Sequence, residues 1–260
     1  MEFKRVVGNR RTIRFYYPWR PVEREKIQTV LEAARLASRG VNASWAKAIV
    51  LYRDQVSEEL RNRLKDPTTS AQLDLAPVWI CWFADLKAVD VAIERETLKE
   101  LVGLQVLPPS HGWSPRYVDS VVKPQVLDPI RTSETINYML SCREAALAVS
   151  QALLAAVDEG LGTALTSMNP AAVTTITKAP ENYSFMCAQL LGYSAESIEG
   201  GQRPREPFED SFFEGVYGKP FKRDETVVKH LRDAGMIQDQ GQPWRKAEVR
   251  GLARMFELPT

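Results

Sequence analysis

Hydrophobic residues recur with helical spacing in two stretches of the chain. Between Pro21 and Ala37, apolar side chains fall at i, i+3, i+4 and i+7, which predicts an amphipathic helix with one buried face. These positions are Ile27, Val30, Leu31 and Ala34. Residues 135–159 are rich in Ala and Leu on nearly every side and stop at Gly160, a frequent helix terminator. A helix that is apolar all round belongs in a protein core or in an interface between subunits.

Four shorter apolar runs carry β-branched or aromatic side chains and predict strands. They span residues 47–53, 77–83, 163–168 and 185–193. Further short helices are predicted at 1–7, 56–64, 93–102, 225–234 and 246–256. This order predicts an α+β fold in which helices flank a small central sheet. The length of 260 residues fits a single domain over 1–260.

Two segments fall outside this regular pattern. Residues 86–133 form a long insertion, and its 108–115 stretch combines proline and glycine with a histidine and a tryptophan. The insertion is either a lid over a pocket or an excursion on the surface, and the sequence leaves both interpretations open. Residues 208–260 form a C-terminal extension with the last two predicted helices.

The composition excludes several classes of protein. With 34 basic and 33 acidic residues, the net charge of +1 provides no general attraction for nucleic acid or anionic membranes. A nucleic-acid-binding module is therefore disfavoured, and no sequence signal of such a module is present. The chain has no uninterrupted run of 18 apolar residues and no apolar segment after Arg10 and Arg11, so we expect no membrane span, no export signal and a cytoplasmic location.

Metal and nucleophile chemistry have little support in the sequence. The three cysteines, Cys81, Cys142 and Cys187, are scattered and form no CxxC pair. The two histidines, His111 and His230, are far apart and lack the spacing of metal ligands. We therefore expect no metal site, and no Ser-His-Asp or Cys-His arrangement is apparent.

The most distinctive polar feature is a group of arginines ahead of the first amphipathic helix. Residues 9–15 read Asn-Arg-Arg-Thr-Ile-Arg-Phe, and a second basic stretch at 200–207 carries Arg203 and Arg205. Arginine is a permanently charged, forked donor suited to phosphate oxygens, and Thr12 adds a hydroxyl donor. The segment is either a solvated basic stretch or one side of a phosphate site.

Four segments, in this order, resemble the FMN-dependent nitroreductase family, the NAD(P)H-dependent flavin oxidoreductases. Residues 10–15 are similar to the family's Arg-Arg-Ser-x-Arg-x-Phe opening, and 33–42 correspond to its Ala-Pro-Ser-x-x-Asn region. The Ala-rich helix leads into Gly-Leu-Gly-Thr at 160–163, and Leu-Gly-Tyr at 191–193 precedes the Arg-Pro-Arg of 203–205. The glycines at 160 and 162 follow a predicted helix, so they are no dinucleotide-binding fingerprint. The resemblance implies a mostly antiparallel sheet and a long central helix at a dimer interface.

The resemblance also implies which residues bind FMN. Arg10, Arg11 and Thr12 would converge with Arg203 and Arg205 on the phosphate, and Arg14 would reach the pyrimidine edge and stabilise the anionic reduced ring. Further implied contacts come from a neighbouring subunit or from the strand beside the ring. They are Ser38 and Asn42, from the neighbour, and Ser167 and Met168, from the strand. Arg39, next to Ser38, is a further candidate for cofactor binding.

Within the resemblance, the sequence departs from the family at Ser38, at Arg39 and at Ser44-Trp45-Ala46, where the family usually has Gln-Pro-Trp. Ser38 replaces the usual proline and Arg39 the usual serine, so an extra positive charge lies beside the pocket. This charge either favours an acidic substrate or strengthens phosphate binding. No residue is certain to be catalytic, because the flavin N5 carries the chemistry in this family.

The implied activity is hydride transfer from NADH or NADPH through FMN to a small electron-poor acceptor, such as a nitroaromatic or a quinone, by a ping-pong mechanism in a homodimer. Alternatives on the same scaffold are an oxidase, a dehalogenase, a flavin-fragmenting enzyme, or a flavin-binding protein without turnover. The sequence does not choose between the two nicotinamides.

Overall fold

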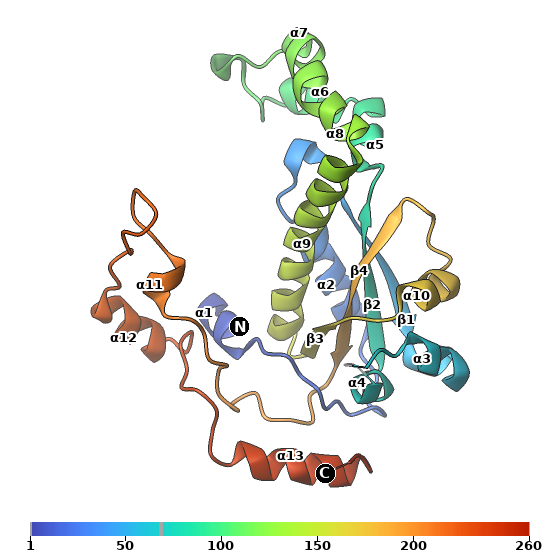
Figure 1. Cartoon of the computed structure of the whole chain (residues 1–260), viewed down its shortest axis with the longest axis vertical. Coiled ribbons are helices and arrows are strands. Elements are labelled where there is room, and N and C mark those ends of the chain that lie inside the picture. The colour runs from blue at the N-terminus through green and yellow to red at the C-terminus, as the bar shows by residue number, and fades with distance from the viewer. Residues whose placement is uncertain (1, 68–69, 260) are drawn as a thin grey trace.

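The computed structural model describes residues 2–67 and 70–259 and contains a small antiparallel sheet flanked by helices, as predicted (Figure 1). Its strands are β1 (Ala46–Tyr52), β2 (Val78–Asp85), β3 (Gly162–Thr166) and β4 (Tyr183–Gly192). They lie in the order β1-β2-β4-β3, and each neighbouring pair is antiparallel. All eight residues of β2 are buried, because this central strand is covered on both faces.

One face of the sheet is covered by two long helices. These are α2 (Arg24–Arg35) and α9 (Glu134–Asp158), which contact each other extensively. The predicted apolar stripe of α2, including Ile27 and Val30, packs with Ala152 of α9 and Ile80 of β2 in one hydrophobic cluster. Both helices were predicted from the spacing of their apolar residues, and both are confirmed.

The opposite face is covered by three short helices, α3 (Glu58–Leu64), α4 (Ser70–Leu75) and α10 (Pro170–Thr177). Their buried side chains, Leu64, Leu73 and Val173, pack in a second cluster with Phe83 of β2 and Leu190 of β4. The sequence predicted α3 and left the segment of α10 as either a helix or a loop. The start of α10 has a local signal, since Asn169 caps the helix and accepts a hydrogen bond from Ala172, with Pro170 in the first turn.

The helix α9 is long and apolar enough to cross a membrane by length and composition alone, although core helices meet the same criterion. In the most apolar 18-residue stretch of this helix, 44% of the residues are buried inside the protein. Small residues make the close contacts with α2 and the sheet. They are Ala148, Ala152 and Ala156. Burial in the core therefore accounts for one face of this helix.

The insertion, residues 86–133, is more helical than its sequence predicts. The single helix expected at 93–102 is wrong, because Glu96 adopts a positive φ of 51° and separates two helices. The insertion contains α5 (Ala88–Glu94), α6 (Thr97–Gly103), α7 (Pro115–Tyr117), a wide π-type helix (Val118–Leu127), α8 (Asp128–Thr132) and a 3-10 turn (Pro109–His111). Its apolar residues pack with Trp45 in a cluster of their own, and the insertion lies beyond one end of α9 (Figure 1).

The C-terminal extension folds back over the beginning of the chain. It contains α11 (Phe208–Ser211), α12 (Glu225–Asp233) and α13 (Arg245–Met255), of which α12 and α13 were predicted. The first helix, α1 (Phe3–Asn9), touches the turn after α12 so closely that a Cβ on Gly8 would lie 1.9 Å from the carbonyl oxygen of Gly235. Beyond α13, the ring of Phe256 stacks on Phe15 at 6.2 Å between centroids. The extension therefore contacts both sides of residues 10–14.

Candidate functional site

Residues 10–14, the arginine segment, run as extended chain along the free edge of β3. Thr12 forms a parallel bridge with Thr163, and the Ile13 N–H donates to the Thr163 carbonyl at 3.0 Å. The side chain of Ile13 is buried in the core under the sheet. Because side chains alternate along extended chain, burial of Ile13 leaves its neighbours Thr12 and Arg14 directed away from the core.

The arginine segment and the loop after β4 meet around one cavity of about 470 Å³. Five of the predicted phosphate-binding residues line it. They are Arg10, Arg11, Thr12, Arg203 and Arg205. Leu154 of α9 and Gly201 also contribute to the wall. The structure therefore brings together the two basic segments that the sequence separates, and we call this space the arginine cavity.

The arginine cavity concentrates positive charge without matching negative charge. Burial, and then the nearby Arg205 and Arg203, lower the pKa of Arg10. Burial, and then Arg203, also lower the pKa of Arg14. Arg14 itself does not line the cavity. Within the described part of the chain, the guanidinium groups of Arg10, Arg14, Arg203 and Arg205 form no ion pair with a carboxylate. Like charges held this close favour a bound anion, which would offset their mutual repulsion.

Arg11 has a different environment from the other arginines. Its Nη2 donates to Oε1 of Gln238, in the C-terminal extension, at 3.2 Å. Burial lowers the pKa of Arg11, the nearby Arg245 lowers it as well, and Glu196 raises it. Its Nε is buried and has no hydrogen-bond partner among the described residues. The structure thus gives Arg11 a contact with the extension that the sequence did not predict, in addition to its place in the cavity wall.

The predicted contacts at Ser38, Arg39 and Asn42 lie beside the middle of α9, away from the arginine cavity. They belong to the loop around a 3-10 turn (Gly40–Asn42), where the Gly40 N–H donates to the buried carboxylate of Glu144 at 2.7 Å. Arg39 lines a separate cavity of about 140 Å³. Glu144 lines this second cavity and Leu154 the arginine cavity, ten residues further along α9 or about 15 Å of helix. The two predicted groups therefore do not share a cavity within one chain.

The side chains of Ser167 and Met168, which were predicted to lie beside the flavin, contact other parts of the protein instead. The strand predicted to end at Met168 ends at Thr166. Met168 is 2% exposed and belongs to the core cluster between the sheet and α10, while the Ser167 hydroxyl donates to Asp66. Neither residue lines the arginine cavity. Only their backbone groups remain available for the predicted contact.

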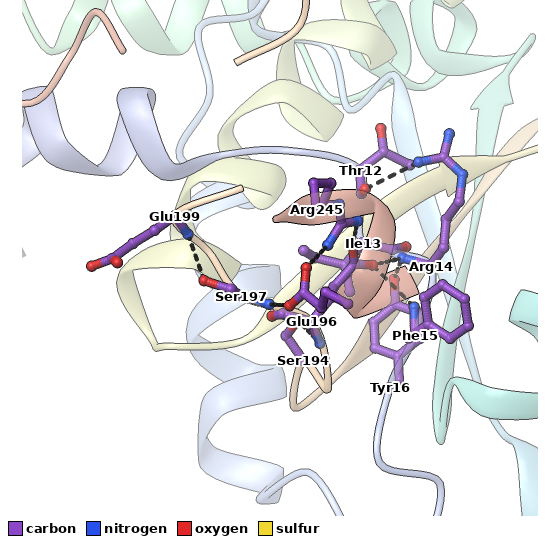
Figure 2. Close-up of polar contacts among 11 residues, drawn as sticks. Thr12, Ile13, Arg14, Phe15, Tyr16, Ser194, Glu196, Ser197, Glu199 and Arg245 are labelled. Carbon is purple, nitrogen blue, oxygen red and sulfur yellow. Dashed lines mark hydrogen bonds and ion pairs between the residues drawn. The ribbon is translucent and has the colours of Figure 1, made fainter. Parts of the chain in front are cut away.

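Two further residues at the site were not predicted, Glu196 and Arg245. The buried Glu196 carboxylate accepts hydrogen bonds from the backbone N–H groups of Arg14 and Phe15 and forms an ion pair with Arg245 of α13 (Figure 2). A lone glutamate after a strand carries no recognisable signal, and its partner comes from another part of the chain. Only the three-dimensional path of the extension brings this pair together.

The thiol groups of Cys81 and Cys187 belong to the sheet and do not line the arginine cavity. Burial raises the pKa of Cys81 to about 12 and that of Cys187 to about 11, so both stay protonated at neutral pH. Across the described ranges, 2–67 and 70–259, no group of three His, Cys, Asp or Glu side chains is arranged to hold a metal ion.

The model of the nitroreductase family matches residues 7–193, and the chain belongs to this family. Solved structures with the same fold include a nitroreductase from Exiguobacterium sibiricum in complex with FMN, 21% identical, with 81% of this chain and 95% of that chain covered and a TM-score of 0.62. An NAD(P)H:FMN oxidoreductase from Staphylococcus epidermidis is 17% identical, with coverage of 81% and 94% and a TM-score of 0.64.

A third structure, B. megaterium NfrA1, is 19% identical with a TM-score of 0.60, and the match covers 100% of this chain and 94% of the NfrA1 chain. The C-terminal extension therefore has a counterpart in a solved structure. Comparison with curated protein sequences gives no match.

Proposed function

We propose that this protein is an FMN-dependent oxidoreductase that transfers hydride from NADH or NADPH to a small electron-poor acceptor in two half-reactions. Membership of the nitroreductase family supports a flavin-dependent oxidoreductase. The observation that carries the proposal for this chain is the arginine cavity, a space of about 470 Å³ lined by Arg10, Arg11, Arg203 and Arg205. Among the described residues, none of these four arginines forms an ion pair with a carboxylate. This volume falls within the usual range of about 300–1,000 Å³ for ligand sites.

The residues of the cavity fit the phosphate end of FMN. Arg10, Arg203 and Arg205 would bind the phosphate dianion through charge-assisted hydrogen bonds, and Thr12 would add a hydroxyl donor. Arg14 would lie at the pyrimidine edge and stabilise negative charge there. When bound, the flavin supplies the group that accepts and returns the hydride, and the protein supplies binding, orientation and electrostatics.

The loop of residues 38–42 would complete the site from a second copy of the chain. Two observations support a homodimer. The loop lies about 15 Å along α9 from the arginine cavity of its own chain, and α9 exposes apolar side chains. These are Ile136, Tyr138, Met139 and Leu147. Sedimentation equilibrium should give the mass of two chains, and the mass of a single chain would contradict this part of the proposal.

We expect Arg14→Ala to slow anaerobic reduction of the bound flavin about tenfold, because it removes one electrostatic stabiliser of the reduced ring. The Kd for FMN should change less than the rate, since the phosphate contacts belong to other residues. Stopped-flow absorbance gives the rate and fluorescence titration gives the Kd. Arg14→Lys, which keeps the charge, should retain more of the rate than Arg14→Ala. Equal changes in rate and Kd would show that Arg14 has no separate role.

The proposed function is tested by the absorbance spectrum of the purified protein before and after anaerobic addition of each nicotinamide. Bands near about 370 and 450 nm that NADH or NADPH bleaches would support the proposal. Bands that neither nicotinamide bleaches would point to a different reductant or to one of the oxidase-like alternatives. A colourless protein that also fails to bind added FMN would contradict the assignment of the arginine cavity.

A further inference from the structure

Glu196 holds the backbone of the arginine segment. It follows β4, is 3% exposed, and its Oε1 accepts from the N–H groups of both Arg14 and Phe15, the second at 3.0 Å. The Glu196 N–H donates to the Ser194 hydroxyl at 3.2 Å, which holds the loop that carries the carboxylate. A single carboxylate oxygen shared by two successive amides fixes both the position and the direction of the chain at this point.

The other oxygen of Glu196 is occupied by α13. Arg245 pairs with Oε2 of Glu196 through one amino group and with Glu248 through the other. Glu248 in turn accepts from the Ser197 N–H at 2.6 Å, so the contacts form a closed ring between α13 and the loop after β4. Figure 2 shows Arg245 and the backbone of Arg14 and Phe15 on either side of Glu196. We call Glu196, Arg245 and Glu248 the carboxylate ring.

The carboxylate ring separates the charges of the site into two groups. Arg245 is the cation that pairs with Glu196, and the guanidinium of Arg14 forms no ion pair with it. Yet Glu196 lies close enough to Arg14 and Arg11 to affect the pKa of each. A buried carboxylate that loses its partner needs a new one, because an unpaired buried charge is strongly unfavourable. Without Arg245, the guanidinium groups of Arg14 and Arg11 would be the cations within reach.

We propose that Glu196 and Arg245 are positioning residues, through which the C-terminal helix α13 holds the arginine segment in place and keeps the Arg14 guanidinium free for the flavin. This inference rests on the proposed function for its ligand. Glu196 then anchors the backbone, and among the described residues no carboxylate lines the arginine cavity. The extension, which lies beyond the family match at 7–193, is thereby part of the cofactor site.

The test compares Arg245→Met with the wild type, and Arg250→Met serves as the matched control because Arg250 is an exposed arginine on the same helix. We expect Arg245→Met to raise the Kd for oxidised FMN about tenfold. It should also weaken the preference for reduced over oxidised FMN about tenfold, a shift of the two-electron midpoint potential of about −30 mV. Arg250→Met should change neither quantity, and Arg245→Lys should restore part of both.

A second measurement uses the protein without cofactor. Hydrogen exchange at the amides of Arg14 and Phe15 should accelerate at least about tenfold in Glu196→Ala, while amides in the centre of β2 keep their rates. If the exchange rate rises equally at every amide, the variant is globally destabilised. The same exchange measurement is then made on the milder variant Arg245→Lys. Unchanged exchange at Arg14 and Phe15 in both variants would overturn the anchoring role.

The outcomes separate this inference from the proposed function. A wild type that binds no FMN would contradict the proposed function, whereas the exchange of the Arg14 and Phe15 amides would still test the anchor. A wild type that binds FMN, with unchanged Kd and midpoint potential in Arg245→Met, would leave the function intact and overturn the positioning role. Loss of affinity in Arg250→Met equal to that in Arg245→Met would also overturn it, since a general effect of positive charge on α13 would then suffice.

Discussion

Replacing Arg10 with alanine is expected to weaken FMN binding about 10- to 100-fold, because a hydrogen bond to a charged group contributes about 1.5–3 kcal/mol. Arg10 is half-buried between the arginine segment and the loop after β4, and both Arg205 and Arg203 affect its pKa. Arg10 therefore interacts electrostatically with both arginines of the second basic segment. Arg203 and Arg205 are exposed, so Arg203→Ala should mainly weaken FMN affinity, and by less than Arg10→Ala.

The measurement is a fluorescence titration of the cofactor-free protein with FMN at two salt concentrations. Arg63→Ala is the matched control, since Arg63 is an exposed arginine of α3, which covers the opposite face of the sheet. If Arg10→Ala and Arg63→Ala change the Kd equally, the effect comes from net charge and the phosphate assignment is wrong. Weaker dependence on salt in Arg10→Ala would agree with the loss of one direct phosphate contact.

Replacing Phe83 with alanine is expected to lower the free energy of unfolding by about 3–5 kcal/mol. The ring is fully buried in the central strand and lies against Tyr183 and Phe185 of β4, with centroids at 6.2 and 5.7 Å. Because β2 pairs with strands on both sides, the surrounding core has little freedom to collapse into the space left by the ring.

Urea unfolding of the cofactor-free protein measures this difference, since a bound flavin would add its own stabilisation. Tyr217→Ala serves as the comparison, because Tyr217 is an aromatic side chain that is 90% exposed. Its effect should stay within about 0.5 kcal/mol. A change of similar size in both variants would mean that Phe83 does not contribute to a tightly packed core.

The sequence predicted the elements in which the local pattern and the tertiary environment agree. Residues 47–53 and 77–83 are apolar and β-branched because they lie inside the sheet, and their strands are found at Ala46–Tyr52 and Val78–Asp85. The helix α9 was predicted from its alanines and leucines, which pack against α2 and the sheet. In each case the same side chains that bury the element also determine its periodicity.

The insertion was predicted poorly because its structure depends on features that periodicity does not record. The break at Glu96 requires a positive φ in a residue that rarely adopts one. Pro124 lies inside the wide helix Val118–Leu127, where a regular α-helix would lose a hydrogen bond. The apolar residues of this segment pack mainly with one another and with Trp45, so the sheet does not fix their spacing.

The candidate site was predicted in part. The arginine-rich composition of residues 10–14 and 203–205 indicated an anion site, and the structure places both segments at one cavity. The partners of Arg11 and of the Arg14 backbone could not be predicted, since they come from Gln238 and Glu196. Such contacts depend on the paths of the loop after β4 and of the C-terminal extension, and a local sequence pattern does not contain those paths.

The wall of the arginine cavity combines residues inside the family match at 7–193 with residues that follow it. All four strands end by Gly192, so a chain shortened at residue 193 would retain the whole sheet and the helices on both of its faces. It would lose Glu196, Arg203 and Arg205 together with α13, and with them one wall of the cavity. Substitutions or length changes after residue 193 would therefore act on the wall of the arginine cavity and leave the four strands unchanged. Homologues that align only over the sheet share an architecture with this protein and need not share its ligand.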